Sequence, residues 1–446
     1  MYVCGPTVYN DIHIGNARSI VAFDTIRRYL TYRGYEVRFI SNFTDVDDKM
    51  IKRADEEGIS VYELANRFIS RYEADTLKIN VQAPTVRTRA TDFIPQIVDF
   101  ISKLLIKGYA YQSEGDVYFR TRKFKSYGKL SDQTISQLLV GASEHVNLVE
   151  QNRKEDLLDF ALWKGQKGHE IAWDAPFGKG RPGWHIECSA MAFSELGKTI
   201  DLHGGGEDLE FPHHENERAQ SESLTGQTFV RYWMHNAFVT VNNDEKMSKS
   251  LNNFVTLHQA IADQGANFMR FFLVQTNYRK PLQYSETSLA QAKRNYQRLI
   301  NTMNALKELK PNDSLNEFKR EEFASQVKNY REKFITAMDD DFNVQNALSV
   351  VYECLKWVNK EINRNQIDRK ILVLILNLLT EWFNVFGIKE DGSNEITDEY
   401  LLDLINKRNQ ARQERNFKLS DQLRDQLIKL GVSIEDTLDG SKYKIK

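Results

Sequence analysis

The chain has 446 residues, of which 41% are hydrophobic and 27% charged, and its formal net charge is −2 at pH 7. This composition is that of an ordinary soluble protein of two to four domains, and it excludes nucleic-acid binding through a general excess of basic residues. Only three cysteines are present. They are too few for a disulfide framework, and no leader or long apolar segment stands out, so we expect a cytoplasmic protein without membrane contact.

The first 40 residues predict a β-α-β unit of Rossmann type. A strand runs into Gly5-Pro6, a helix with periodic apolar residues ends near Gly34, and a second strand covers 37–40. The segment His13-Ile14-Gly15-Asn16 stands at the start of that helix. Free backbone N–H groups and the helix dipole make such a corner a phosphate site. Neither a dinucleotide fingerprint nor a P-loop sequence is present, so neither explains it.

Residues 97–168 interrupt the α/β pattern. They combine a predicted helix (97–107) with a hairpin-like segment (115–120). We interpret them as an insertion between two halves of one sheet, which is expected to resume near Glu187 and to include a strand at 237–241.

The most informative stretch follows a short strand and three glycines, after which Pro212 is predicted to open a helix. On that helix His213 and Glu217 are four residues apart and share one face. Such a pair is most often a solvated surface pair. With Cys4 and Cys188, however, it would form a tetrahedral zinc shell of two sulfurs, one nitrogen and one oxygen. The His-Gly-Gly-Gly run also resembles the oxyanion loop of lipases, but the sequence has no Gly-x-Ser-x-Gly elbow.

The second half of the chain begins with Lys246-Met-Ser-Lys249-Ser250 and is then mostly helical, from 268 to 385. Two lysines and two serines on one loop suit a triphosphate clamp, although a solvated loop is the alternative. Within the helical part we expect Asp339–Asp341 to form a helix cap at a solvated corner, and Cys354 to be a packed core thiol.

The C-terminal tail is locally basic, with a net charge of +4 between residues 407 and 429. A solvated helix face and a phosphate-binding surface are both compatible with this charge. Its basic residues are Lys407, Arg408, Arg412, Arg415, Lys418, Arg424 and Lys429.

Two of these segments, His13–Asn16 and Lys246–Ser250, resemble the paired motifs of class I aminoacyl-tRNA synthetases. Further segments narrow the resemblance to the cysteinyl-tRNA synthetase family and extend it over nearly the whole chain. These segments are Met1–Tyr9, Asn42–Lys49, Arg181–Ser189, Phe211–Glu217, Asp341–Asn343, Arg408–Arg412 and Glu435–Thr437.

The resemblance implies an α/β fold: a Rossmann-type parallel-sheet catalytic domain split by an insertion, then an α-helical bundle and a small C-terminal anticodon-binding domain. The implied bounds are 1–96 and 169–241 for the catalytic halves, 97–168 for the connective insertion, 242–290 for the clamp-loop and stem-contact region, 291–388 for the bundle and 395–446 for the anticodon-binding domain.

The implied activity joins L-cysteine to tRNA(Cys) with ATP and Mg²⁺, one zinc per chain selecting the substrate thiolate, in a monomer. The resemblance implies four overlapping groups of site residues. They are the metal ligands Cys4, Cys188, His213 and Glu217; the ATP or adenylate contacts His13, Gly15, Asn16, Gly205, Asp208 and Lys249; the amino-acid contacts Thr44, Trp184 and His203; and the catalytic residues His13, Asn16, Lys246 and Lys249.

His214 and Glu215 are expected to point away from the metal face. Three positions depart from the family pattern, namely Asn16, Glu207 and Asn252. The chain also begins at Met1-Tyr2 without the family's short leading segment, so we expect weaker support for a sheet edge at Cys4.

Two other functions are possible. One is a related ligase that activates cysteine for a small amine, which would not need the tail from 403 to 446. The other is a noncatalytic zinc protein that binds RNA, which would not need both His13 and the loop at 246–250.

Overall fold

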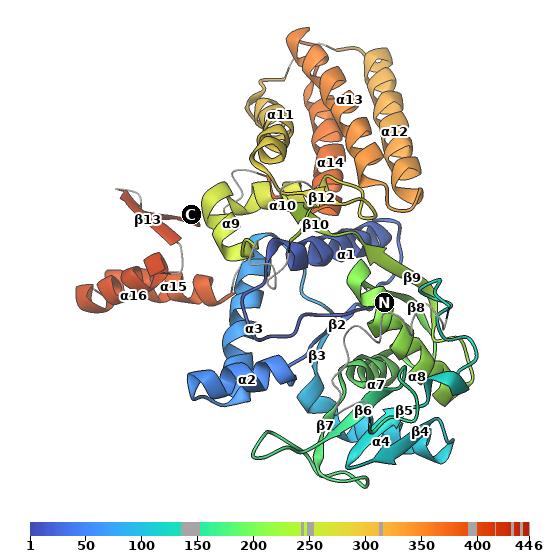
Figure 1. Ribbon diagram of the computed structural model, residues 1–446. Helices are drawn as coiled ribbons and strands as arrows, with labels where there is room; N and C mark the ends of the chain where they lie inside the picture. Colours follow the sequence, from blue (N-terminus) through green and yellow to red (C-terminus); the bar gives the residue numbers. More distant parts are fainter. Residues whose placement is uncertain are drawn as a thin grey trace. The chain divides into compact units, whose positions relative to one another are not determined.

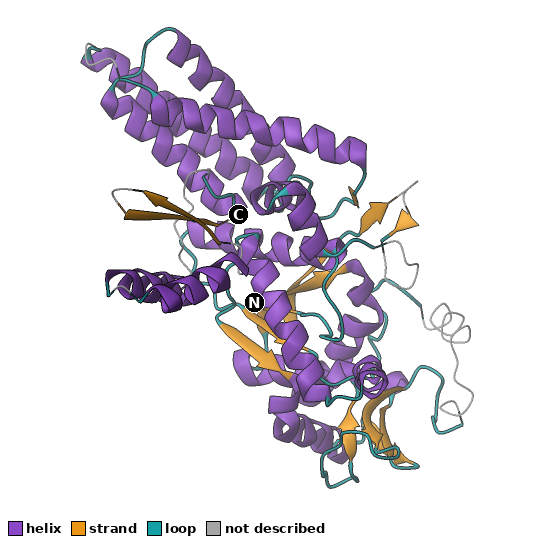
Figure 2. Ribbon diagram, turned by 90° about the vertical axis from the view of Figure 1, so that its left-hand side faces the viewer, coloured by secondary structure: helices purple, strands orange, loops and turns teal. Residues whose placement is uncertain are grey.

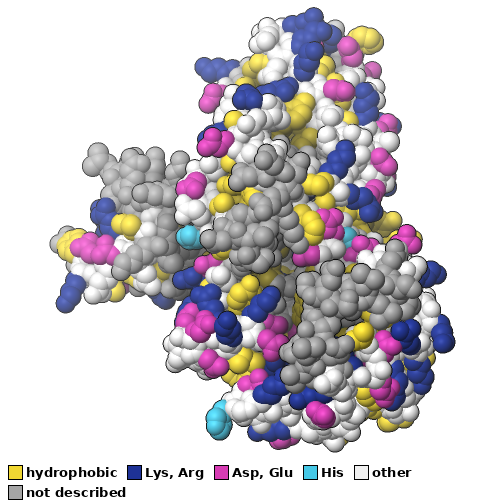
Figure 3. Space-filling view, in the orientation of Figure 1, with side chains coloured by type: hydrophobic (Ala, Val, Ile, Leu, Met, Phe, Trp, Pro, Cys, Tyr) yellow, Lys and Arg dark blue, Asp and Glu magenta, His cyan; other side chains and the backbone are white. Residues whose placement is uncertain are grey.

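The computed structural model describes residues 1–134, 152–241, 245–247, 254–311, 315–390, 399–414, 416–429, 432–437 and 440–445. These residues form two compact units, Met1–Ile388 and Lys389–Lys446. Among the described helices, none has both the length and the apolar character needed to cross a membrane. On the face of the first unit in Figure 3, acidic and basic side chains are interspersed.

A five-stranded parallel sheet lies at the centre of the first unit (Figure 1), in the order β3-β2-β1-β8-β9. Its strands are β1 (Tyr2–Val3), β2 (Ile40–Phe43), β3 (Val86–Arg89), β8 (Ile200–Gly206) and β9 (Val230–Asn236). The strand order reverses between β1 and β8, and ligands of open α/β sheets bind at such a point. β1 is paired on both sides, so the expectation of a weakly supported sheet edge at Cys4 is wrong.

Alternate residues of β1 pack against helices on opposite faces of the sheet, because successive strand side chains point in opposite directions. Val3 lies in one apolar cluster with Phe23 of α1 (Ile14–Tyr32). Tyr2 lies in another with Met191 of α7 (Trp184–Leu196). Glu187 therefore belongs to a helix, and the prediction that the sheet resumes there is wrong. The second strand also starts later than expected, at Ile40.

The insertion forms a four-stranded antiparallel sheet with one covering helix, and it lies at the opposite end of the first unit from the helical bundle (Figures 1 and 2). Its elements are α4 (Ile94–Ile106), β4 (Ala110–Ser113), β5 (Asp116–Phe119), β6 (Phe160–Gly165) and β7 (Gly180–Pro182). A separate apolar cluster joins Ile97 and Phe100 to Phe119 and Leu162. The sheet continues to Pro182, past the expected limit at residue 168.

The helical bundle consists of α11 (Glu286–Glu308), α12 (Glu317–Asp339), α13 (Val344–Asn363) and α14 (Arg369–Phe386). Its core is aromatic and aliphatic, and the Phe334 and Trp382 rings stack with centroids 5.1 Å apart. Cys354 is fully buried, which confirms it as a core thiol.

Asp339, the last residue of α12, and Asp341 just after it do more than form a solvated corner. Asp339 accepts a hydrogen bond from the Tyr29 hydroxyl at 2.6 Å. Asp341 accepts one from the Tyr278 hydroxyl at 2.8 Å and pairs with Arg279 at 2.5 Å. These contacts tie the end of α12 to α1 and to the segment after α10, which the sequence pattern did not indicate.

The remaining elements of the first unit connect these parts. They are α2 (Asp48–Glu57), α3 (Val61–Lys78), α8 (Glu215–Thr225), β10 (Val239–Val241), β11 (Glu245–Lys246), α9 (Leu257–Gln264), α10 (Ala266–Val274) and β12 (Leu282–Gln283), with 3-10 turns at Ala90–Phe93, Thr121–Lys123 and Glu207–Leu209 and a π-turn at Glu210–His214.

The second unit contains two helices and a hairpin, namely α15 (Glu399–Gln413), α16 (Phe417–Lys429), β13 (Val432–Thr437) and β14 (Gly440–Ile445). Leu404, Leu427 and Val432 contribute to its small core. Arg408 is also buried, so it does not belong to the basic surface that the sequence suggested.

Candidate active site and metal centre

Cys4 is placed by the turn that follows β1. Its backbone N–H donates to the Gly204 carbonyl at 3.2 Å, and the Gly5 N–H donates to Asn42 Oδ1 at 2.9 Å. A Cβ on Gly5 would lie 1.6 Å from the Asn42 carbonyl oxygen, so this close approach requires glycine. The turn thereby brings the Cys4 thiol to the carboxyl ends of β1 and β8.

The histidine–glutamate pair forms as predicted. Phe211 has extended backbone angles (φ −133°, ψ 134°) and breaks the turn Glu210–His214, so helical backbone begins at Pro212 and runs into α8 at Glu215. His213 Nε2 lies 3.1 Å from Glu217 Oε1. Both side chains are buried.

The predicted set of metal ligands converges. Donor atoms of Cys4, Cys188, His213 and Glu217 all lie within 4.8 Å of one another. The two sulfurs are 3.8 Å apart, and Cys4 Sγ is 3.6 Å from Glu217 Oε1. Tetrahedral coordination by zinc, with bonds of about 2.3 Å to sulfur and 2.1 Å to oxygen, places such donors about 3.8 and 3.6 Å apart. These four side chains therefore fit a zinc ion.

Two further histidines support this set from behind. His203 Nε2 lies 3.0 Å from Glu217 Oε2, the oxygen that faces away from the sulfurs. His185 Nδ1 lies 2.9 Å from His213 Nδ1. Partners of this kind hold ligands in the orientation that a metal needs.

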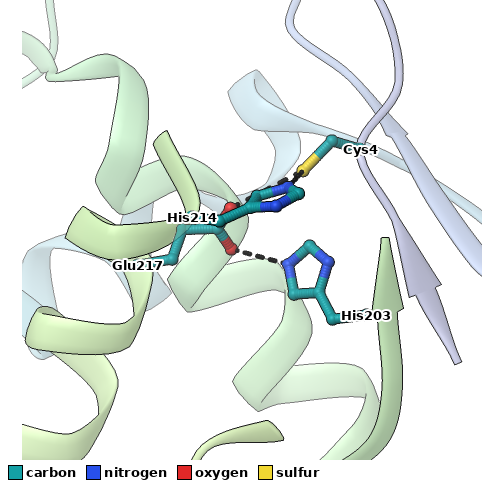
Figure 4. Close-up of side chains that lie close together, drawn as sticks. All are labelled: Cys4, His203, His214 and Glu217. Carbon is teal, nitrogen blue, oxygen red and sulfur yellow. Dashed lines mark hydrogen bonds and ion pairs between the residues drawn. The ribbon is translucent and has the colours of Figure 1, made fainter. Parts of the chain in front are cut away.

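A second set of donors competes for the same place. Figure 4 shows Cys4, His203, His214 and Glu217 together, and their donor atoms also lie within 4.8 Å of one another. His214 Nε2 is 3.5 Å from Cys4 Sγ, so the expectation that His214 points away from the metal face is wrong. We favour the set with Cys188, since two sulfurs suit zinc better than one and His203 and His214 then serve as its outer partners.

Glu215 does point elsewhere, as expected. Its buried carboxylate accepts hydrogen bonds from the backbone N–H groups of Leu130 and Ser131, at 2.9 and 3.1 Å, and pairs with Arg218. It therefore secures the insertion rather than the metal centre.

The four ligands strongly perturb one another's ionisation. A hydrogen bond from Cys4 and the nearby His213 lower the pKa of Cys188 to about 6, whereas burial raises the pKa of Cys4 well above its usual value. Burial disfavours the imidazolium of His213, but the negative charges of Glu217 and Cys188 outweigh it and raise its pKa to about 10. The site thus concentrates negative charge, and a metal cation would take the place of the His213 proton.

A cavity of about 630 Å³ opens beside these ligands. The predicted site residues on its wall are Cys4, His13, Gly15, Asn16, Thr44, Trp184, Cys188, Asp208 and His213. Trp184 lies over His213, with ring centroids 4.5 Å apart, and is 41% exposed. His203 is not on the wall but behind Glu217, which differs from its expected place in the amino-acid pocket. Gly205 is likewise off the wall, packed against Leu209 and His214.

The start of α1 also lines the cavity. His13 caps this helix: its Nδ1 accepts from the Asn16 N–H, and Asn16 Oδ1 accepts from the His13 N–H, both at 3.2 Å. Asn16 therefore has a structural reason to be present. Its neighbour Gly15 has no room for a side chain, because a Cβ there would lie 2.8 Å from the His13 ring.

The predicted clamp loop is anchored at both ends beside this corner. On one side the Met247 N–H donates to the Val239 carbonyl at 2.9 Å. On the other, the Ile14 N–H donates to the Val255 carbonyl at 3.0 Å. Lys249 and Asn252 lie outside the described residues, as does the side chain of Lys246.

The structure shows the hydrogen-bond partners of two acidic residues, Glu187 and Glu207, which the sequence did not predict. Glu187 is fully buried in α7, where it accepts a hydrogen bond from the Thr44 hydroxyl at 3.1 Å. Burial, with the charges of Cys188 and Asp45, raises its pKa well above the usual value. An acidic residue directly beside the predicted metal ligand Cys188 was the available signal. Glu207 accepts from the Phe238 N–H at 3.2 Å and so turns toward the β9–β10 connection.

Comparisons with known proteins agree with this geometry. Residues 1–294 match the family described as tRNA synthetases class I (C) catalytic domain, and residues 333–390 match the DALR domain. A Mycobacterium tuberculosis methionyl-tRNA synthetase bound by methionyl-adenylate has the same fold, with a TM-score of 0.63 at 15% identity over 94% of this chain and 96% of that one. The catalytic fold is thus that of the class I aminoacyl-tRNA synthetases.

Full-length relatives narrow the class. The cysteine–tRNA ligase of Limosilactobacillus reuteri is 52% identical over 446 residues, covering 100% of this chain and 94% of the relative. That of Enterococcus faecalis is 52% identical over 445 residues, with the same coverage. The chain belongs to the cysteine–tRNA ligase family.

Proposed function

We propose that the chain activates L-cysteine with ATP and Mg²⁺ and transfers the cysteinyl group to the 3′ end of tRNA(Cys). The observation that carries this proposal is the ligand set beside the cavity, which combines two sulfurs, a nitrogen and an oxygen at the separations of a zinc site. Family membership supports the same reaction.

Cys4, Cys188, His213 and Glu217 would hold one zinc per chain. The ion would supply an additional coordination position for a soft ligand, and a cysteine thiolate fits that position better than a serine hydroxyl. Pocket shape alone separates two such similar side chains by only about 1–3 kcal/mol. The ligand set is therefore expected to account for most of the selection against serine.

Residues on the cavity wall would bind the rest of the amino acid. Trp184 covers the metal side of the cavity and limits access of water. Asp208 provides a carboxylate that suits the substrate ammonium group, and Thr44, held by Glu187, provides a hydroxyl near the substrate backbone. These assignments come from the geometry of the wall and from the family resemblance.

ATP phosphates would bind at the start of α1, where His13 and Asn16 fix the first turn and Gly15 keeps the backbone accessible. The anchored ends of the clamp loop support the assignment of Lys246 and Lys249 to the departing pyrophosphate. Gly205 would shape the adenylate side of β8, and His203 would act through Glu217.

The second unit would bind the anticodon, which favours a tRNA ligase over an enzyme that couples cysteine to a small amine. A monomeric working form, the cytoplasmic location and the expected domain bounds stay predictions from the sequence.

Amino-acid-dependent ATP–pyrophosphate exchange tests the proposal most directly. The purified chain is assayed with each standard amino acid, and zinc is measured in the same sample. Exchange with cysteine alone and one zinc per chain are the expected results. Exchange with another amino acid, or with serine at a comparable rate, would contradict the proposal.

A further inference from the structure

Three basic side chains on the cavity wall have no role in the site described above. One of them, Arg27, donates to the Ala83 carbonyl, and the other two are Lys49 and Arg87. Lys49, near the start of α2, lies with its Nζ 5.8 Å from the centroid of the Tyr9 ring. Arg87, on β3, lies with its Cζ 4.6 Å from the Phe43 ring and 5.2 Å from the Tyr72 ring. Both line the same cavity as Thr44 and Trp184.

Neither cation is neutralised by a described residue. The Lys49 ammonium and the Arg87 guanidinium make no hydrogen bond or ion pair with any side chain or backbone group in the described ranges. Three other basic side chains nearby in the chain do have polar partners. Arg53 pairs with Glu57, Arg71 pairs with Asp11, and Arg89 donates to Asn66. Unpaired cations held on aromatic faces beside a cavity are available for an anionic ligand.

The acids closest in sequence to Lys49 are already engaged. Asp47 caps α2 by accepting from the Lys49 backbone N–H at 2.7 Å. Asp48 pairs with Lys164 at 2.7 Å and with Arg181. The positive charge of Lys49 is therefore not cancelled by the start of its own helix.

The position of this pair separates it from the ATP corner. Arg87 lies opposite Ser41 in the sheet, and β2 separates β3 from β1, so β3 is about 10 Å from the central strand. The corner at the start of α1 adjoins β1, whose other neighbour is β8. Arg87 thus lies on the side of β1 that faces away from β8, and Lys49 belongs to α2, which follows β2 in the chain.

We propose that Lys49 and Arg87 form a phosphate subsite for the backbone of the last nucleotides of the RNA acceptor. This inference rests on the proposed function. The acceptor's terminal hydroxyl must reach the carboxyl group of an amino acid bound between Thr44 and Trp184, so the phosphates preceding it must pass along the cavity rim. Arginine and lysine are the usual partners of such phosphates.

The test separates activation from transfer in the full-length zinc-containing chain. Activation is measured by cysteine-dependent ATP–pyrophosphate exchange without RNA. Transfer is measured in single turnover, from preformed enzyme-bound cysteinyl-adenylate to a tRNA(Cys) transcript below saturation. Lys49→Gln and Arg87→Gln should each leave exchange within about twofold of wild type and slow transfer about tenfold, as expected for one lost charge-assisted contact.

The salt dependence of the transfer rate distinguishes a phosphate contact from a purely structural role, which would leave it unchanged. Each variant should reduce the slope of log transfer rate against log salt by about 0.7, the value for one phosphate contact on a single strand. Arg89→Gln is the matched control, because Arg89 is on the same strand but is paired outside the cavity, and it should leave both rate and slope unchanged. Arg87→Lys should retain more transfer than Arg87→Gln.

The remaining outcomes would overturn the inference. Equal loss of exchange and transfer would assign the cations to ATP, and unchanged transfer in both variants would leave them only a packing role. If Arg87→Gln lowers the melting temperature, Lys49→Gln decides the result, since Lys49 is exposed. Absence of cysteine-dependent exchange in the wild-type chain would contradict the proposed function itself, before the variants are compared.

Discussion

The metal centre and the helical bundle are both built from buried side chains, but their chemistry is opposite. The metal centre gathers two thiols, several imidazoles and a carboxylate from segments far apart in the chain, all of them buried except the half-buried Cys4 on the cavity wall. The bundle buries mainly aliphatic and aromatic side chains from consecutive helices. Burial in the first region therefore sets donor geometry, whereas burial in the second supplies stability, because apolar burial is favourable and buried charges are costly unless paired.

The largest expected effect comes from removing one sulfur at the metal centre. Cys188→Ala should abolish zinc binding and cysteine-dependent exchange, because three remaining ligands leave the shell open. Zinc content by elemental analysis and exchange activity are measured together. The matched control is Cys354→Ala in the bundle core, which should retain both zinc and exchange. Full exchange by Cys188→Ala without zinc would contradict the proposed role of the metal.

The bundle should show the reverse pattern. Trp382→Ala removes a fully buried ring that stacks on Phe334, and it should lower the free energy of unfolding by about 3–5 kcal/mol. Urea unfolding measures the loss, while zinc content and the exchange rate of the folded protein should be unchanged. Val373→Ala on the same helix is the control, because Val373 is 51% exposed and should change stability by less than about 0.5 kcal/mol. A change in zinc content would show that the two regions are coupled.

Unlike the metal ligands and the bundle core, Lys249 is expected to stabilise the negative charge that develops on the departing pyrophosphate. Lys249→Ala should lower kcat for activation about 10²-fold, the scale for one lost electrostatic donor, with little change in stability. Steady-state exchange at varied ATP measures kcat and KM separately. A variant whose only defect is a raised KM for ATP would be inconsistent with this role.

Glu215 and Glu217 are two residues apart, yet Glu215 contributes to stability and Glu217 to the metal centre. Glu215→Gln should keep zinc and lower the free energy of unfolding by about 1–3 kcal/mol, because its carboxylate accepts backbone N–H groups of the insertion. Glu217→Gln should lose zinc. Elemental analysis and urea unfolding of both variants check this division, and loss of zinc from Glu215→Gln would refute it.

The smallest effect is expected where the bundle meets the core. Burial opposes ionisation of Asp341, but hydrogen bonds from Arg279 and Tyr278 outweigh it and lower the pKa of the carboxyl group. Its stabilising contribution should therefore be present above the unfolded pKa of about 3.9 and should be lost as pH falls through the lower folded value. Because the pair is half exposed, Asp341→Asn should cost less than about 1 kcal/mol at pH 7. Unfolding curves of wild type and Asp341→Asn at pH 3 and pH 7 measure how much stability the carboxylate contributes at each pH.

Much of the site could be predicted from the sequence because its residues carry distinctive chemistry. Cys4, Cys188, His213 and Glu217 were identifiable as one ligand set from residue type, short-range spacing and family resemblance. The start of α1 was identifiable from the strand, the turn and the helix pattern around His13. Such signals are local, so they survive without knowledge of the fold.

Tertiary structure decided the relations between segments. The spacing of His213 and Glu217 was sufficient for their contact, since helical backbone starts at Pro212. His214 faces Cys4, however, because the turn after β1 brings the Cys4 thiol beside it. Spacing along an ideal helix does not contain that information.

Residue identity and local periodicity were enough to predict the fold class, the family and the side chains that could bind a metal. Three features became visible only in the folded chain: β1 is the central strand, His203 and His185 hold the ligands from behind, and Lys49 and Arg87 share the cavity with the amino-acid pocket. These features arise from packing between different elements, from 14 residues apart for His203 and Glu217 to about two hundred for β1 and β8, and from parallel strand pairing. Neither leaves a short-range pattern in the chain.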